Sequence, residues 1–310
     1  MSIIEQAARR LEQLRNSGIE VTPLKGATPA SVATEALPAR ATRRLEEAQR
    51  PTAAAPVAAE RAPRINGTHR SKVVEVDLAR LASMGYVSPT AGRAQVADDF
   101  RVIKRRLLSY ARDKASENGN LIMVTSSLPE EGKTFVAVNL AMSIAMELDH
   151  TVLLVDADVS RPSVLSRLGL PSSGGLLDVL ADPSIDLSEV LLRTNIDKLS
   201  LLPAGAPRAH ATEMLSSESM DRVLSELATR YQDRIVVFDA PPLLPSTESR
   251  AVATRMGQVI LVVEAKRTPQ RAVVQALSTI EDCPVVLPLL NKANRSELGH
   301  YYGYYGLDER

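Results

Sequence analysis

Ser127-Leu-Pro-Glu-Glu-Gly-Lys-Thr134 is the stretch that decides the fold, and it joins the apolar run Leu121–Thr125 to the helix-like stretch Phe135–Leu148. It matches the phosphate-binding pattern GxxxxGK[S/T] except at its first position, where serine replaces glycine. In that pattern, backbone N–H groups at a helix N-terminus surround phosphate groups, a lysine contacts the β- and γ-phosphates, and a hydroxyl binds magnesium. Lys133 and Thr134 supply the lysine and the hydroxyl. The alternative is a chance Gly-Lys-Thr turn, which the strand–loop–helix context disfavours.

Short apolar runs alternate with helix-like stretches along the rest of the chain. The expected strands are Leu121–Thr125, Val152–Val155, Leu199–Leu202, Ile235–Phe238, Val259–Val263 and Val285–Leu290. The expected helices are Val96–Ala115, Phe135–Leu148, Met214–Tyr231 and Gln270–Glu281. Buried strands that alternate with helices are typical of a parallel sheet with helices on both faces. We therefore expect an α/β fold of the P-loop type, with a parallel sheet at its centre.

Three acidic residues follow apolar strands. Asp156 and Asp158 come directly after Val152–Val155, and Asp239 ends the stretch Ile-Val-Val-Phe-Asp. The carboxyl ends of parallel strands meet at the crevice where α/β sheets bind ligands, so we expect these carboxylates to converge there. Carboxylates together with phosphates form a magnesium site, because hard cations prefer oxygen ligands. The alternative is that each aspartate caps the N-terminus of a helix.

The first third of the chain has a different character. Residues 1–18 predict an amphipathic helix, because Ser2 and Glu5 form a capping box and Gly18 can end the helix. Between Ala27 and Pro63, 18 of 37 residues are Ala or Pro, so residues 19–95 predict a mostly disordered linker. Residues 1–95 are either a solvated flexible tail or a docking helix joined to the domain by a flexible linker. We expect the P-loop domain to span residues 96–291.

The aromatic residues are unevenly placed. The chain has no Trp, three Phe and seven Tyr, and four of the tyrosines fall within the last ten residues: Tyr301, Tyr302, Tyr304 and Tyr305. Chain termini are normally poorly ordered, so a cluster of large aromatic residues there needs a functional reason. Three glycines within residues 292–310 predict a pliant tail that carries these tyrosines.

Composition excludes several classes of protein. The 37 basic and 37 acidic residues cancel, which argues against a nucleic-acid-binding protein. A single cysteine, Cys283, excludes a disulfide framework, a cysteine-rich zinc site and a thiolate-bound iron–sulfur cluster. No apolar run approaches the roughly 18 residues that cross a bilayer, and no signal peptide opens the chain. We expect a soluble, cytoplasmic protein.

Taken together, these motifs resemble those of the bacterial tyrosine kinases (BY-kinases). The resemblance rests on the phosphate loop, the Asp156-Ala-Asp158 strand end with its following Arg161-Pro162, the Asp239-Ala-Pro-Pro242 strand end and the terminal tyrosines. The opening Met-Ser-Ile-Ile-Glu and the stretch Phe100-Arg-Val-Ile-Lys-Arg are similar to the tyrosine autokinases of exosortase (PEP-CTERM) exopolysaccharide loci. Protein kinases of the eukaryotic type are excluded, because the chain has no HRD or DFG sequence.

The resemblance implies a role for each matching residue. Lys133 and Thr134 match the Walker A lysine and hydroxyl, and Asp239 matches the Walker B acid. Asp156 and Asp158 match the Walker A′ acids, one of which orients or deprotonates the attacking hydroxyl. Magnesium would be held by Thr134, Asp158 and Asp239. The implied ATP-binding residues are Ser127, Leu128, Pro129, Glu130, Glu131, Gly132, Lys133, Thr134 and, against the adenine, Asn291.

Two positions depart from the family's pattern. Glu130 stands where the family has glycine, and the backbone angles that glycine permits there cost other residues about 1–3 kcal/mol. We therefore expect Glu130 to weaken nucleotide binding without abolishing it. The family's ExxRxxR oligomerisation motif corresponds to Asp98, Arg101 and Lys104, so the acid and the second basic residue are conservative replacements.

The resemblance also implies an activity and partners. It implies an ATP- and Mg²⁺-dependent autokinase that phosphorylates its own terminal tyrosines, in trans, and regulates the chain length and export of an exopolysaccharide. The implied partners are a separate membrane-embedded chain-length regulator, further copies of the chain in a homo-oligomer, and a cognate tyrosine phosphatase. Recruitment to the inner face of the membrane would use the N-terminal helix or the basic face between Lys104 and Lys114.

Two other functions stay open on the residues alone. A positioning ATPase of the plasmid-partition or septum-site class shares this fold, but such proteins carry an extra lysine where this chain has Leu128. A non-catalytic nucleotide-binding adaptor would tolerate Glu130. Labelled ATP separates the three functions: a kinase labels its tyrosines, an ATPase releases labelled phosphate, and an adaptor does neither.

Overall fold

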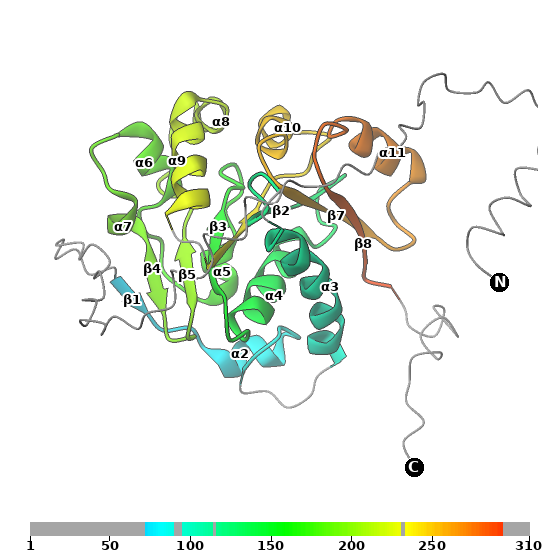
Figure 1. Cartoon of the computed structure of the whole chain (residues 1–310), viewed down its shortest axis with the longest axis horizontal. Helices are drawn as coiled ribbons and strands as arrows, with labels where there is room; N and C mark the ends of the chain where they lie inside the picture. The colour runs from blue at the N-terminus through cyan, green and yellow to red at the C-terminus, as the bar shows by residue number, and fades with distance from the viewer. Residues whose placement is uncertain (1–71, 90–94, 114–115, 231–232, 294–310) are drawn as a thin grey trace, which may run out of the picture. The chain divides into compact units, whose positions relative to one another are not determined.

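The computed structural model describes residues 72–89, 95–113, 116–230 and 233–293. The predictions for the N-terminal helix, for the linker up to residue 71 and for the terminal tyrosines lie outside these residues. One sheet runs through the described part of the chain, in the order β1-β4-β5-β3-β6-β2-β7-β8 (Figure 1). Its strands are β1 (Lys72–Val74), β2 (Leu121–Ser126), β3 (Thr151–Asp156), β4 (Leu192–Thr194), β5 (Leu199–Leu202), β6 (Arg234–Asp239), β7 (Gln258–Glu264) and β8 (Val286–Asn291).

Helices cover both faces of this sheet (Figure 1). They are α2 (Leu78–Ser83), α3 (Gln95–Ala111), α4 (Lys133–Ala145), α5 (Val164–Leu168), α6 (Leu176–Ala181), α7 (Leu187–Val190), α8 (Ala211–Leu215), α9 (Glu218–Thr229), α10 (Thr247–Ala253) and α11 (Gln270–Ser278). All neighbouring strands are parallel except the antiparallel pair β4 and β5. The predicted α/β fold with a largely parallel, two-sided sheet is therefore confirmed.

The alternation of side chains along β2 explains the two layers. Leu121 and Met123 belong to a core that includes residues of α6, α8, α9, α10 and α11. Ile122 and Val124 belong to a second core, shared with α2, α3, α4 and α5. Successive side chains of a strand point to opposite faces, so a strand buried on both faces is apolar at every position, as β2 is along most of its length.

Two predicted boundaries in this part of the chain are wrong. The expected helix Met214–Tyr231 is divided into α8 and α9, because the hydroxyl of Ser217 accepts a hydrogen bond from the Met220 N–H and starts a new helix. The predicted linker 19–95 extends too far, since residues 72–89 belong to the folded domain. Within them β1 pairs with β4 and Leu81 is completely buried. Both β1 and β4 have only three residues, too few to show a pattern.

The segment 72–89 is tied to the helix that follows the phosphate loop. The Val87 N–H donates to Oδ1 of Asn139 on α4 at 2.6 Å. The ring of Tyr86 lies against that of Phe135, with 5.1 Å between the ring centroids.

Within the described ranges, no helix combines the length and the apolar character needed to cross a lipid bilayer.

Candidate active site

The phosphate loop has the context that its sequence predicts. Strand β2 ends at Ser126, and α4 begins at Lys133. Gly132 lies between them with a φ of 95°, in the left-handed region that favours glycine. A Cβ atom at this position would lie 2.1 Å from Nδ2 of Asn291. Glycine is therefore required both by the backbone angle and by the neighbouring side chain.

The three predicted carboxylates meet beside this loop. Asp156 and Asp239 end the adjacent parallel strands β3 and β6 and lie opposite each other in the register. Strand β6 also pairs with β2, which leads into the loop. Asp156, Asp158 and Asp239 are at most 4% exposed. Neighbouring parallel strands thus bring residues more than 80 positions apart to one edge of the sheet.

Lys133 forms an ion pair at the centre of this edge. Its Nζ lies 2.6 Å from Oδ2 of Asp158, and both side chains are largely buried. The other oxygen of Asp158 accepts a hydrogen bond from the Arg161 N–H at 3.1 Å. The hydroxyls of Thr134 and Ser163 are 3.1 Å apart. A triphosphate that reaches Lys133 must compete with Asp158 for its ammonium group.

Asp156 and Asp239 retain unpaired oxygen atoms. Neither carboxylate oxygen of Asp239 has a hydrogen-bond partner among the described residues, and the same is true of Oδ1 of Asp156. Burial raises the pKa of Asp239 to about 7, although Lys133 opposes the shift. Burial also raises the pKa of Asp156 to about 6, against the hydrogen bonds that Oδ2 accepts from the Val164 and Ser163 N–H groups. Buried acceptors of this kind suit a ligand that brings positive charge.

The predicted magnesium residues fit that ion in part. Thr134 offers a hydroxyl, Asp239 offers two unpaired buried oxygens, and Asp158 would have to share its carboxylate with Lys133. In the described ranges, no group of three or more His, Cys, Asp or Glu side chains is arranged to hold a metal. Mg²⁺ usually keeps water and takes substrate phosphates as further ligands. The donors present suit a magnesium ion that arrives with a phosphorylated substrate.

A cavity of about 1000 Å³ is lined in part by Lys133, Thr134 and Asp158, whereas Asp156 and Asp239 are not among its lining residues. The loop contributes Pro129, Glu130, Gly132, Lys133 and Thr134 to its lining, and Asn291 and Lys292, which contact the loop, line it as well. Its other lining residues include some that were not predicted as site residues: Met84, Tyr86, Phe135, Ser160, Arg161, Ser163, Arg167, Pro241, Pro242, Pro245, Ser246 and Glu248. The two consecutive prolines after Asp239 were part of the motif, but only the tertiary fold brings Met84 and Tyr86 to the cavity.

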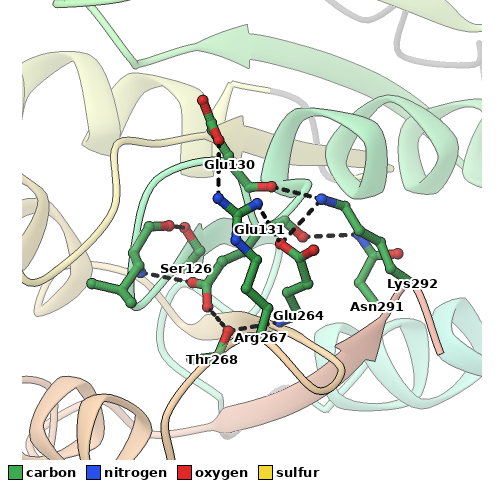
Figure 2. Close-up of polar contacts among 9 residues, drawn as sticks. Ser126, Glu130, Glu131, Glu264, Arg267, Thr268, Asn291 and Lys292 are labelled. Atoms are coloured by element: carbon green, nitrogen blue, oxygen red, sulfur yellow. Dashed lines mark hydrogen bonds and ion pairs between the residues drawn. The ribbon is translucent and has the colours of Figure 1, made fainter.

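Glu130 adopts the conformation that its position demands. Its φ is 66°, an unfavourable value for a residue with a Cβ. The side chain points outward and pairs with Arg267 at 3.3 Å, while its carbonyl accepts a hydrogen bond from Lys292 at 2.9 Å. Figure 2 shows both contacts. Outward placement keeps the carboxylate away from the loop's interior.

Three of the predicted ATP-binding residues do not line the cavity: Ser127, Leu128 and Glu131. Glu131 is 2% exposed, and its Oε2 accepts a hydrogen bond from the Leu128 N–H at 2.7 Å. That carboxylate faces into the protein, so the predicted contact of Glu131 with ATP would have to come from its backbone. Asn291 does line the cavity, but its amide donates to the Glu131 carbonyl at 2.9 Å.

The predicted oligomerisation residues of α3 separate into two environments. Asp98 and Arg101 pair with each other on the surface at 2.5 Å. Lys104 is 6% exposed and binds the Ser143 carbonyl and Glu147 of the α4 region, each at 2.7 Å. The prediction that Lys104 lies on the exposed basic face of α3 is therefore wrong, and its assignment to the oligomerisation motif stays a prediction. Its long aliphatic stem is buried between α3 and α4 while its ammonium reaches acceptors.

Comparison with known proteins identifies relatives. A family model described as "AAA domain" matches residues 121–287. The chain is 27% identical to the tyrosine-protein kinase YwqD of Bacillus subtilis over 71% of this chain and 90% of that protein. It is 29% identical to the succinoglycan biosynthesis transport protein ExoP of Rhizobium meliloti, over 71% of this chain but only 28% of that protein. The kinase domain of the Escherichia coli tyrosine kinase ETK shares the fold, with a TM-score of 0.55, 20% identity, and coverage of 72% of this chain and 91% of that domain.

Proposed function

We propose that this chain, which belongs to the AAA domain family and within it to the bacterial tyrosine kinases, phosphorylates the tyrosines of its own C-terminal segment with ATP. The observation that carries the proposal is the Lys133–Asp158 ion pair beside two buried carboxylates with unpaired oxygens, both of Asp239 and Oδ1 of Asp156. A phosphate loop alone would suit any nucleotide-binding protein. Asp158, which lines the same cavity as the loop, adds a carboxylate that can accept the proton of a hydroxyl.

The reaction is a phosphoryl transfer. The phenolic oxygen of a tyrosine forms a bond to the γ-phosphorus of ATP, the bond from that phosphorus to the β–γ bridging oxygen breaks, and ADP leaves. The phenolic proton passes to a carboxylate, for which Asp158 is suited because it lines the cavity. Tyrosine has a pKa near 10, but the loose transition state of phosphoryl transfer needs mainly positioning and charge neutralisation.

The residues of the chain divide these tasks. Lys133 moves from Asp158 to the phosphates, which frees the Asp158 carboxylate for the acceptor hydroxyl or for the metal. Thr134, Asp158 and Asp239 would hold Mg²⁺, which when bound neutralises phosphate charge. Asp239, completely buried, would have to be ionised to do so, and its pKa of about 7 allows this at neutral pH. The loop N–H groups at the start of α4 would donate hydrogen bonds to phosphate oxygens.

The cavity has room for an acceptor beside the nucleotide. We place the acceptor beside Met84, Tyr86, Arg161 and Arg167, which also line the cavity. Met84 and the two arginines are exposed, so an incoming tyrosine ring could contact Met84 and the rim of Tyr86. In the sequence, Tyr301 lies only ten positions after Asn291. The segment 292–310 could span up to roughly 60 Å if extended, enough for transfer to a second copy of the chain.

We further propose a role in exopolysaccharide export, together with a separate membrane-embedded regulator and a cognate phosphatase. The name of ExoP supports this role, because it describes a polysaccharide transport protein that shares this domain. Arg105 and Arg106 on α3, and Arg112 directly after it, are exposed and form a candidate dock for an acidic partner or for the inner face of the membrane. Several phosphates on one tail would repel one another and loosen a homo-oligomer that the tail connects.

Labelled ATP tests the proposed activity directly. Wild-type protein with Mg²⁺ should acquire γ-phosphate label on tyrosine, and Lys133→Met should not. Release of the label only as free phosphate would instead indicate that the chain is a positioning ATPase. Absence of both reactions, with ATP bound, would favour the adaptor.

A further inference from the structure

Glu131 fixes the phosphate loop from within. Its buried carboxylate accepts the Leu128 N–H through one oxygen at 2.7 Å and the hydroxyl of Thr268 through the other. Thr268 follows β7, more than 130 positions along the chain, and its hydroxyl oxygen is held by the Glu264 N–H at 3.1 Å. The loop is therefore connected through one carboxylate to the turn that joins β7 to α11 (Figure 2).

The end of β8 holds the same loop from a second side. Asn291 donates to the Glu131 carbonyl, and Lys292 donates to the Glu130 carbonyl, each at 2.9 Å. The Lys292 ammonium also pairs with Glu264 at 3.1 Å. Two consecutive carbonyls of the loop are thus fixed by two consecutive side chains. Figure 2 shows these contacts converging on Glu130 and Glu131.

These contacts surround the strained part of the loop. Glu130 and Gly132 both have positive φ angles, and Glu131 lies between them. A non-glycine residue persists in such a conformation only where the surrounding structure over-determines it. Hydrogen bonds to the carbonyls of residues 130 and 131 and to the side chain of residue 131 provide that constraint on both sides of the strained residue.

We propose that Glu131 is a positioning residue, which with Thr268 and Asn291 holds the phosphate loop in its phosphate-binding shape before nucleotide arrives and thereby compensates for glutamate at position 130. The inference rests on the proposed function only in taking ATP as the ligand. Glu131 does not touch the nucleotide, because it is buried and does not line the cavity. Its effect on the reaction passes through the backbone of residues 128–132.

A loop that is already shaped costs less conformational entropy to bind a ligand. We call the hydrogen bonds of Glu131 with Leu128, Thr268 and Asn291 the brace. Loss of the Thr268 hydroxyl would remove one of these hydrogen bonds and leave those with Leu128 and Asn291 in place. Hydrogen bonds to charged groups are among the stronger ones in proteins. Because the brace acts on bound nucleotide and transition state alike, its loss should raise KM for ATP and leave kcat nearly unchanged.

The experiment exchanges Thr268 in the full chain. Thr268→Val removes the hydroxyl and keeps the shape, Thr268→Ser restores the hydroxyl, and Thr279→Val is the control. Thr279 is also half-buried, but its hydroxyl bonds only to the Ala276 carbonyl of α11. ATP affinity is measured by titration with a fluorescent ATP analogue, and KM and kcat by tyrosine phosphorylation. Thr268→Val should raise KM for ATP about tenfold, and Thr268→Ser and Thr279→Val should stay within about twofold of wild type.

A second substitution tests the link to Glu130. Glu130→Gly removes the strain that the brace opposes, so Thr268→Val in that background should raise KM by less than about threefold. Wild-type affinity in Thr268→Val, failure of Thr268→Ser to restore affinity, or a parallel fall of kcat and thermal midpoint would overturn the inference. Wild-type protein that neither binds ATP nor phosphorylates tyrosine would instead refute the proposed function.

Discussion

The buried carboxylate of Asp239 should make the nucleotide-free protein less stable as pH rises. Its two oxygens have no hydrogen-bond partner among the described residues, and burial raises its pKa from 3.8 to about 7. Because the folded-state pKa exceeds the unfolded value, the stabilising contribution is fully present below about pH 4 and is lost as pH rises through 7. Asp239→Asn resembles the protonated acid in shape and stays neutral, so it should escape this loss.

The pKa difference sets the size of the effect. Each tenfold change in proton affinity corresponds to about 1.4 kcal/mol, so ionising Asp239 in the folded chain costs on the order of 4 kcal/mol. For a domain of this size, such a difference shifts the thermal midpoint by on the order of 10 °C. At pH 4.5 ionisation of this carboxyl stabilises the unfolded chain by only about 1 kcal/mol, so the thermal midpoints of the two proteins should differ by only a few degrees.

Thermal unfolding at pH 4.5 and 8, without nucleotide or magnesium, measures this prediction. The substitution Asp239→Asn should raise the midpoint at pH 8 and change it little at pH 4.5. Adding Mg²⁺ and ATP should narrow the difference, because these ligands would stabilise the ionised carboxylate of the wild type. A variant that is equally or less stable than wild type at pH 8 would refute the reasoning.

Three further predictions concern separate parts of the site. Glu130→Gly relieves a φ of 66° in the phosphate loop, so the Kd for ATP should fall by about threefold to tenfold; an unchanged Kd in titration would count against this. Lys104→Met should lower the free energy of unfolding by about 1–3 kcal/mol and leave the sedimentation coefficient unchanged, and the reverse pattern would restore Lys104 to an oligomer surface. Arg167→Ala should raise KM for a peptide of residues 292–310 about fivefold with KM for ATP unaltered, whereas equal effects on both constants would contradict a role at the acceptor end of the cavity.

The fold was predictable because its signals are local. Strands β2, β3 and β6 are apolar runs that end in the loop or in an aspartate, and parallel strands bring such ends together. Helix α4 begins at the lysine of a Gly-Lys-Thr sequence that specifies both the helix start and the phosphate site. Periodicity and motif spacing therefore give the sheet, the loop and the three carboxylates without tertiary information.

The remaining features depend on partners distant in sequence. Lys104 belongs to the exposed basic face of α3 by composition, but a carbonyl on α4 and Glu147 draw it inward. Glu131 has the sequence position of a ligand residue, and only Thr268, 137 positions later, shows that its carboxylate faces the protein. Tyr86 lies in a segment of short elements that is held in the folded domain by its packing on α4.

Mass spectrometry of the C-terminal peptide after incubation with ATP and Mg²⁺ tests the central claim most directly. For wild-type protein, phosphate is expected on tyrosines of the cluster Tyr301, Tyr302, Tyr304 and Tyr305. Lys133→Met should carry none, because the phosphate loop then lacks the ammonium that contacts the β- and γ-phosphates. A wild-type peptide that stays unmodified while ATP is hydrolysed to free phosphate would contradict the proposal that this chain phosphorylates its own tyrosines.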